Sequence, residues 1–252
     1  MTNLFESKIE KVRALFLINA LVSVCYVAYY GITLNQVAIA FGVFFLMNCL
    51  GITATFHRYY SHRSYEFRND FIRKLCTLFG MLSCSGSAIG WAGIHRSHHA
   101  HSDTHDDPHQ AERGFWNMLS LSYNSDFSPK LVVDLMRDKY LLHAHQYYFV
   151  PSLVYVLALY LSFGVTGIII GFSIPSVITL SSEGITNYVN HAAKNDYKPV
   201  NVWWMNLFSF GDGWHKNHHD KPTIYTTQKK WYEIDVTGII IKYFLSKKVV
   251  TG

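Results

Sequence analysis

The chain has 252 residues, of which 50% are hydrophobic, 16% aromatic and 15% charged, and its net charge is +5. This length suits one domain, and the basic residues form no clustered face with interleaved aromatics, so we expect no nucleic-acid partner. The four cysteines stand singly in apolar stretches. Such cysteines are typical of small buried residues, and their spacing does not indicate a metal site.

Apolar residues are distributed unevenly along the chain. Residues 14–56 contain no charged side chain, and neither do residues 146–182. A helix needs about 20 apolar residues to cross the hydrocarbon core of a bilayer. Each stretch is therefore long enough for two spans joined by a tight turn, the first near Gly31 and the second between Gly164 and Pro175. The predicted spans are residues 14–30, 36–56, 147–165 and 168–190.

The distribution of lysine and arginine predicts the orientation. Both hairpin turns lack these residues, whereas the chain ends and residues 58–74 are rich in them, so the positive-inside rule places both termini in the cytoplasm. Charges of both signs precede residues 14–30, and we expect no cleavable signal peptide. The predicted fold is one all-α, multi-pass integral membrane domain over residues 1–252, with four transmembrane helices in two hairpins. A cytosolic helical cap is expected from residues 57–146 and 191–252.

Residues 75–94 form a further uncharged stretch that is long enough to cross a bilayer. A crossing there would separate His57 and His62 from His95, so that these histidines could not share a site. The stretch is also rich in glycine, serine and alanine. We therefore expect an interfacial or re-entrant helical segment on the cytoplasmic face. Residues 238–250 space lysines among isoleucine and phenylalanine, which predicts a similar surface helix.

Histidine is concentrated in three clusters and one single position. Two clusters have the pattern H-x-x-H-H, which on a helix places positions i, i+3 and i+4 on one face. Imidazole is a common metal ligand, and one metal takes about four to six ligands, so the set predicts two metal ions at the cytoplasmic surface. Ligand type alone permits zinc, iron, copper or nickel. The converging residues are His57, His62, His95, His98, His99, His191, His215, His218 and His219, with Asn187 one helical turn before His191.

Acidic residues near the clusters are candidates for orienting the histidines, because a metal-bound imidazole commonly donates its second N–H to a carboxylate. The candidates are Asp103, Asp107, Asp212 and Asp220. Glu183 is the one charged residue between Gln146 and His191, and an ionisable group inside a span is costly and usually functional. Glu183 is therefore a candidate catalytic residue. The alternative is a glutamate hydrogen-bonded between helices or placed near the membrane edge.

Six segments resemble the membrane-bound fatty acyl desaturases of the Δ9 type, and they extend over nearly the whole chain. They are G-I-T-A-T-F-H-R-Y-Y-S-H-R-S-Y at residues 51–65, W-A-G-I-H-R-S-H-H at residues 91–99, S-D-T-H-D-D-P-H at residues 102–109, R-G-F-W at residues 113–116, N-Y-V-N-H at residues 187–191 and G-D-G-W-H-K-N-H-H at residues 211–219. Together they are far more specific than three generic histidine clusters.

The resemblance implies an enzyme that inserts a cis double bond at Δ9 into a saturated acyl chain, using dioxygen and two electrons. It also implies a di-iron centre bound by the nine histidines, with Asn187 reaching one metal through water. The acyl tail would enter an apolar tunnel between the membrane helices. Candidate substrate-binding residues are Phe41, Phe45 and Thr179.

Animal acyl-CoA desaturases carry an Arg-Asp pair just before the second cluster, where this chain has Gly93 and Ile94. In this respect it resembles the acyl-lipid desaturases of cyanobacteria and their bacterial relatives. The acyl carrier is left open between CoA, a lipid and an acyl carrier protein. An external electron donor is implied, either a ferredoxin or a b-type cytochrome. Surface lysines that could receive it, or simply be solvated, are Lys216, Lys221, Lys229 and Lys230.

Two other functions are compatible with the sequence. A membrane di-iron fatty acid hydroxylase would use a similar histidine-rich site, and differs in whether the carbon radical loses a second hydrogen or takes up oxygen. A divalent-cation-binding membrane transporter would need polar ligands near the middle of the bilayer. The histidines cluster at the predicted membrane surface instead, which favours an enzyme.

Overall fold

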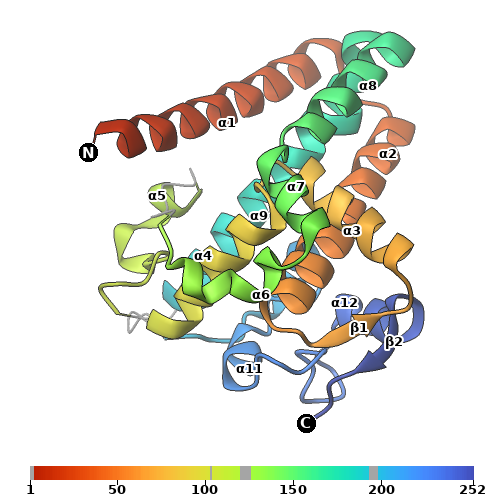
Figure 1. Ribbon diagram of the computed structural model, residues 1–252. Helices are drawn as coiled ribbons and strands as arrows, with labels where there is room; N and C mark the ends of the chain where they lie inside the picture. The colour runs from red at the N-terminus through yellow and green to blue at the C-terminus, as the bar shows by residue number, and fades with distance from the viewer. Residues whose placement is uncertain (1–2, 103, 120–125, 193–197) are drawn as a thin grey trace.

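The computed structural model of the protein describes residues 3–102, 104–119, 126–192 and 198–252. Long helices gather at one end of the molecule, and shorter helices with a small β-ribbon gather at the other (Figure 1). The long segments are α1 (Asn3–Tyr30), α2 (Leu34–Phe45), the π-helix η1 (Leu46–Ser61) that continues α2, α8 (Val150–Ile168), the π-helix η4 (Ile169–Ser173) and α9 (Ile174–Ala192).

Both predicted turns are present, and each uses a glycine with positive φ. Gly31, at φ +74°, separates α1 from α2. Thr33 then caps α2, because its hydroxyl accepts from the Gln36 N–H while the Gln36 side chain accepts from the Thr33 N–H. Gly164, at φ +62° and ψ −153°, breaks the helical geometry inside α8. Glycine suits both turns because it lacks the Cβ that makes this backbone conformation costly.

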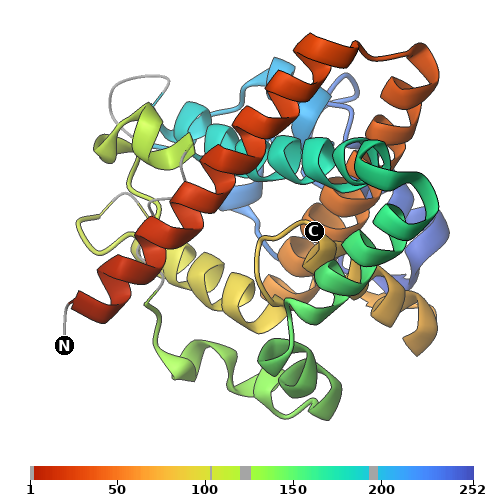
Figure 2. The same ribbon diagram turned by 90° about the horizontal axis from the view of Figure 1, so that it is seen from above.

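Among the described residues, two helical segments are long and apolar enough to cross a membrane, Leu34–Ser61 and Val150–His191. The second contains the break at Gly164 and therefore runs as two helices. Ala14–Tyr30 in α1 is a shorter apolar helix, and Figure 2 shows α1 crossing α9. Large apolar side chains such as Leu161 on α8 are exposed, as they are on helices that face lipid or a partner.

The predicted interfacial segment is helical but is divided by a tight turn. It comprises α3 (Asp70–Leu82) and α4 (Ala88–His101). The turn contains Cys84 and Gly86, at φ +67° and +89°. Gly51 of η1 lies directly against Gly80 of α3, and a Cβ built on Gly51 would be 2.6 Å from the Gly80 Cα. This close packing holds α3 against the helix that carries the first histidine cluster.

The remaining elements are short helices and two strands. They are β1 (Tyr65–Phe67), η2 (Ala111–Arg113), α5 (Phe115–Leu119), η3 (Pro129–Val132), α6 (Val133–Met136), α7 (Lys139–Gln146), η5 (Trp203–Met205), α10 (Asn206–Ser209), α11 (His215–Asp220), α12 (Val236–Ile240), the π-helix η6 (Ile241–Leu245) and β2 (Ser246–Val249). β1 and β2 pair antiparallel, with Tyr65 opposite Val249. The fold is mostly helical, as predicted, with this short β-ribbon as an unpredicted addition. The prediction that residues 238–250 form one surface helix is wrong, because Ser246–Val249 is a strand.

Contacts of β1 explain where the C-terminal helix ends. The Arg68 N–H, just after β1, donates to the Leu245 carbonyl over 2.8 Å, and the Arg68 side chain donates to the carbonyls of Tyr243 and Ser246. These bonds take up carbonyl groups that the last turn of a helix leaves unpaired. The chain then continues as a strand, and Tyr65 and Phe67 are buried in one apolar cluster with Ile241.

Candidate metal centre

The nine histidines singled out from the sequence lie in two compact, adjoining groups. In each group the ring nitrogens that could bind an ion all lie within 4.8 Å of one another. The first group is His57, His62, His95, His99 and His218, and the second is His98, His191, His215 and His219. The rings of His98 and His99, one from each group, are 5.5 Å apart.

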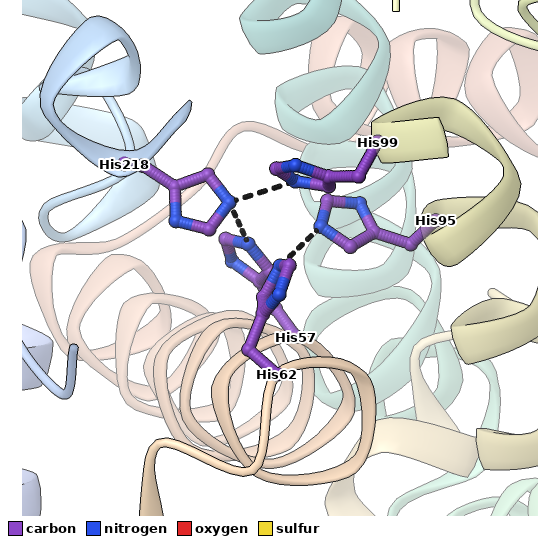
Figure 3. Close-up of side chains that lie close together, drawn as sticks. All are labelled: His57, His62, His95, His99 and His218. Atoms are coloured by element: carbon purple, nitrogen blue, oxygen red, sulfur yellow. Dashed lines mark hydrogen bonds between the residues drawn. The ribbon is translucent and has the colours of Figure 1, made fainter. Parts of the chain in front are cut away.

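Figure 3 shows the five rings of the first group turned toward one another from three elements. His62 directly follows the end of η1, which carries His57, while α4 supplies His95 and His99 and α11 supplies His218. The Nε2 atoms of His57 and His218 are 3.0 Å apart, and those of His62 and His95 are 2.8 Å apart. An ion at their centre would be reached by nitrogens from distant parts of the chain.

The second group is built from α4, α9 and α11. The Nε2 atom of His191, at the end of α9, is 3.0 Å from the Nε2 atom of His215. The Nε2 atoms of His215 and His219 are 3.1 Å apart. The Nε2 atoms of His98 and His219 are 3.4 Å apart. Because α4 and α11 each contribute to both groups, these two helices fix the position of one group relative to the other.

The two H-x-x-H-H patterns are used in opposite ways. On α4 the i and i+4 histidines, His95 and His99, enter the first group, and His98 at i+3 enters the second. On α11 the i and i+4 histidines, His215 and His219, enter the second group, and His218 at i+3 enters the first. The spacing therefore does more than place three rings on one face, since it divides them between two sites.

The spacing of His57 and His62 depends on the π-helix. A π-helix is closed by bonds between residues i and i+5. The His62 N–H donates to the His57 carbonyl over 3.2 Å, so residues five apart lie one turn above each other. Both rings consequently point into the first group. In a regular α-helix, neighbours on one face are three or four residues apart.

Burial makes these imidazoles weak bases. Burial first, and then neighbouring imidazoles, hold the pKa of five of them well below the usual value, namely His62, His95, His98, His215 and His218. The same causes lower the pKa of His99 to about 3 and also lower the pKa of His219. Neutral imidazole is the form that binds metals. Closely spaced neutral rings whose Nε2 atoms converge are a donor set that fits bound metal.

Two of the four candidate carboxylates contact the histidines, one in each group. Asp212 accepts from Nδ1 of His57 over 3.0 Å, and Asp107 accepts from Nδ1 of His98 over 2.8 Å. Burial opposes the ionisation of Asp212, but His57 and Arg58 outweigh it and lower the pKa of this carboxyl. A carboxylate at Nδ1 leaves Nε2 as the nitrogen with a free lone pair, directed into the group.

The other two candidates are placed differently. Asp220 lies at the surface and forms ion pairs with Lys216 and Lys229 at 3.0 and 2.7 Å. It does not point into either histidine group in the described structure. Asp103 lies outside the described residues. Two of the lysines considered for an electron donor are thus already paired with an acid.

A cavity of about 400 Å³ adjoins both groups, and His57, His95 and His215 are among its lining residues. Its wall is largely apolar and includes the side chains of Ile52, Trp91, Ile94 and Leu180, while Asn187 also lines it. A cavity of this size and character can hold a flexible apolar ligand beside the histidines.

Glu183 is the acidic residue of this cavity that faces neither histidine group. Its carboxylate accepts from the Trp91 indole N–H over 2.9 Å and from the Ser85 hydroxyl. The Trp91 ring is stacked on the His95 ring, with centroids 4.9 Å apart. Glu183 therefore connects α9, the α3–α4 turn and a histidine of the first group.

The predicted substrate-binding residues do not line this cavity in the described structure. Phe41 is 56% exposed, Phe45 packs with its ring centroid 5.3 Å from that of Phe210, and the buried Thr179 hydroxyl donates to the Pro175 carbonyl. The π-helical turns that begin after Phe45 rotate the histidines relative to α2. The substrate role of the three residues stays a prediction.

Several residues of the site were not found from the sequence. Arg58, only 1% exposed, donates to Asp212 over 3.1 Å, and His109 lines the cavity with its ring 5.3 Å from that of His98. A charged residue inside an apolar helix was one available signal for Arg58. Nothing local marks Ser85 and Trp91 as partners of Glu183, because those contacts join segments that are far apart in the chain.

The chain resembles known desaturases over most of its length. Residues 35–233 match the family model described as fatty acid desaturase. The sn-1 stearoyl-lipid 9-desaturase of Synechocystis sp. is 32% identical over 224 residues, which cover 83% of this chain and 69% of the relative. The sn-2 palmitoyl-lipid 9-desaturase of Nostoc sp. is 31% identical over 225 residues, covering 82% and 79%.

A yeast relative is also similar. The acyl-CoA desaturase 1 of Saccharomyces cerevisiae is 30% identical over 219 residues, which cover 80% of this chain and 43% of the relative. The apolar helices and these relatives together indicate a membrane protein, and the histidine groups indicate a metal site. The chain therefore belongs to the fatty acid desaturase family and is an oxidoreductase that desaturates fatty acyl chains.

Proposed function

We propose that this protein inserts a cis double bond at Δ9 into a saturated acyl chain carried by a membrane lipid. Dioxygen and two electrons from an external donor, a ferredoxin or a b-type cytochrome, are the co-substrates. Two iron ions occupy the histidine groups, one in each. Their ligands are His57, His62, His95, His99 and His218 for one iron, and His98, His191, His215 and His219 for the other, with Asn187 reaching the second through water.

One observation carries this proposal: two all-imidazole groups adjoin one largely apolar cavity. Removing hydrogen from an unactivated methylene requires a stronger oxidant than any amino-acid side chain, and iron with dioxygen supplies it when bound. The protein holds the chain and excludes water. Ile52, Ile94 and Leu180 contact the methylenes of the acyl chain. Holding one C–C bond in a fixed orientation beside the metal centre lowers the activation free energy by roughly 7–11 kcal/mol.

The residues just before the second histidine cluster favour a lipid as the acyl carrier. Where animal acyl-CoA desaturases carry Arg-Asp, Gly93 packs so closely on the Phe127 ring that a Cβ would be 2.5 Å from a ring carbon. Ile94 lines the cavity. This position thus offers no cation for a CoA phosphate. The names of the cyanobacterial relatives, which are lipid 9-desaturases, support the same choice.

We also infer four membrane crossings with the histidine groups on the cytoplasmic side, in a single domain over residues 1–252. The turns at Gly31 and Gly164 divide the apolar segments into four helices. Neither turn carries lysine or arginine, as the positive-inside rule requires of external turns. The external electron donor would then approach from the cytoplasm, where Lys221 and Lys230 add positive charge beside the ion-paired lysines. Lys230 has its Nζ 5.6 Å from the Tyr232 ring centroid.

Glu183 is the further residue that we assign to the reaction. Through the indole of Trp91 it fixes the ring stacked on His95, and through Ser85 it holds the α3–α4 turn against the cavity. The acyl chain would thereby meet a rigid wall at the point where it passes the metal centre. Glu183 acts as a positioning residue in this assignment.

Product analysis tests the proposed function. The chain is expressed in a host of defined lipid composition, and total acyl chains are analysed by mass spectrometry with localisation of the double bond. We expect Δ9-unsaturated chains in the lipid fraction, and none with His98→Ala. Hydroxylated chains without unsaturated ones would contradict desaturation, and products found in acyl-CoA before they appear in lipid would contradict the lipid carrier.

A further inference from the structure

The segment that follows α11 carries a deeply buried carboxylate, Asp235, that belongs to neither histidine group. Asp235 is 1% exposed and caps α12 through its side chain. It lies just beyond residues 35–233, which match the family model. A buried carboxylate is costly unless it is paired, so its partners indicate what it does.

The partner of Asp235 is Arg58. One Arg58 nitrogen, Nη1, lies 2.7 Å from Asp235 Oδ2 and also donates to the Tyr225 carbonyl over 3.0 Å. The other, Nη2, lies 3.1 Å from Asp212 Oδ1. The guanidinium therefore holds one carboxylate on each side, which its planar fork of donors allows.

Asp212 extends this connection to the first histidine group. While its Oδ1 atom accepts from Arg58, its Oδ2 atom accepts from His57 Nδ1 over 3.0 Å. The ordered contacts therefore run from Asp235 through Arg58 and Asp212 to His57. Each residue in this chain of contacts is buried or nearly so.

The backbone around Asp235 leaves little freedom for these atoms. Gly211, immediately before Asp212, has φ +133°, and a Cβ there would lie 2.8 Å from Asp235 Cγ and 3.0 Å from Arg58 Nη2. The Thr227 N–H donates to Asp235 over 2.8 Å, and the Gly238 N–H donates over 2.9 Å. A shift of Asp235 would therefore move Arg58 or the loop that carries Asp212.

A second carboxylate keeps the same segment in place independently of Asp235. Glu233, 3% exposed, accepts from the backbone N–H groups of Lys229 and Lys230 and from the Asn217 side chain, each within 2.9 Å. Asn217 is a buried residue of α11. Loss of the Asp235 charge alone should thus leave the segment attached to α11.

We propose that Asp235 is a positioning residue of the metal centre, acting through Arg58 and Asp212 to fix the ring of His57. Without the Asp235 charge, the Arg58 guanidinium group donates its hydrogen bonds to Asp212 alone. It then competes with His57 for the Asp212 carboxylate. The effect falls on the first histidine group, because His57 belongs to it, and leaves the second group unchanged. This inference rests on the proposed two-iron function.

The test compares iron binding in Asp235→Asn and in Asp220→Asn, each purified as the full-length protein. Asparagine is as good a helix N-cap as aspartate, so its oxygen can still accept from the Gly238 N–H and preserve α12. The group that faces Arg58 loses its charge and its acceptor oxygen. Asp220 is exposed, and its ion pairs in the described part of the chain are with the surface lysines Lys216 and Lys229, which makes it the matched control. We expect Asp235→Asn to lose iron to a chelator about tenfold more readily, the low end of the effect of residues behind metal ligands.

Mössbauer spectra of protein loaded with iron-57 locate the change. We expect one of two iron signals to shift in Asp235→Asn, and neither to shift in Asp220→Asn. Arg58→Lys, which keeps one charge but cannot bridge two carboxylates, should give the same one-site change. Wild-type spectra and iron retention in both Asp235→Asn and Arg58→Lys, or equal changes at both irons, would overturn the inference. Wild-type protein that holds no iron would instead refute the proposed function.

Discussion

The Nδ1 atom of His98 lies 2.8 Å from a carboxylate oxygen of Asp107, and both side chains are almost fully buried. The contact in the second histidine group matches the contact between His57 and Asp212 in the first. Each proposed iron site therefore has one ring whose orientation is set by an acid. This pairing leads directly to the first prediction.

Asp107→Asn should weaken iron binding at one of the two sites by about 10- to 100-fold, the range typical of residues that hold a metal ligand. An asparagine presents one acceptor where the aspartate presents two, and it carries no charge to favour the Nδ1–H tautomer. Chelator competition followed by iron determination measures the effect. Iron retention equal to that of Asp220→Asn would show that the Asp107 carboxylate does not support His98.

Replacement of a histidine from either group should abolish turnover. His98→Ala removes a nitrogen from the second group and His218→Ala removes one from the first, so each leaves an incomplete ligand set. The measurement is the yield of unsaturated acyl chains at equal protein expression. His143→Ala is the control, because His143 lies on α7 outside both groups. Full activity in both His98→Ala and His218→Ala would contradict the site.

Glu183→Ala should lower turnover while iron content stays at the wild-type level. The substitution leaves the half-buried Trp91 indole N–H without its acceptor, which costs about 1 kcal/mol, and frees the ring stacked on His95. Glu183→Gln keeps an acceptor for Trp91 and a polar partner for Ser85, so it should retain most activity. Equal turnover in the alanine variant and the wild type would remove Glu183 from the account.

Gly51→Ala should destabilise the protein by about 1–3 kcal/mol, because the added methyl group would clash with the backbone of α3 at Gly80. Gly42→Ala, in the helix that continues into η1, is the matched control. A Cβ at Gly42 meets nothing within 4 Å, and alanine favours the helix. Thermal unfolding in detergent compares the two variants, and similar midpoints would contradict the close approach of η1 and α3.

Metal-free protein should lose stability as the pH falls below about 6.5. The His99 imidazole has the ordinary histidine pKa of 6.5 in the unfolded chain and a pKa of about 3 in the folded protein. Between these two pH values the unfolded chain therefore binds more protons than the folded protein. The free energy of unfolding is fully maintained above this window and decreases through it, by about 1.4 kcal/mol per pH unit for each such histidine. Unfolding curves recorded at several pH values test this, and a pH-independent midpoint would contradict the burial of neutral imidazoles.

The fold was predictable where its signals are local. Gly31 and Gly164 stand inside uncharged stretches, and each marks a turn that the structure contains. The β-ribbon was missed because its strands are three and four residues long and lie far apart in the chain. Only their pairing distinguishes Ser246–Val249 from the end of an amphipathic helix.

The candidate site was predictable in its residue types but not in its contacts. The H-x-x-H-H patterns predicted two clusters of rings, whereas their division between two groups depends on how α4 and α11 face each other. Asp212 and Asp220 were equal candidates by sequence. The structure separates them, because the loop at Gly211 directs Asp212 toward His57 while Asp220 reaches solvent.

The position of Phe41 and Phe45 shows a second limit of sequence reasoning. Both were candidate substrate-binding residues on the predicted span 36–56, which leads to His57 in a regular helix. The chain changes to π-helical geometry at Leu46, so that residues before and after this point no longer share a face. No pattern of residue types along 46–61 indicates the change from α-helical to π-helical geometry.

The iron content of the purified wild-type protein tests the central claim most directly. Nine buried or half-buried imidazoles, in groups of five and four, are the proposed ligands of two ions. Elemental analysis of folded, catalytically active protein should give about two irons per chain, and about one after His218→Ala. Active wild-type protein with no iron, or with a single ion that survives His218→Ala and His98→Ala alike, would contradict the account.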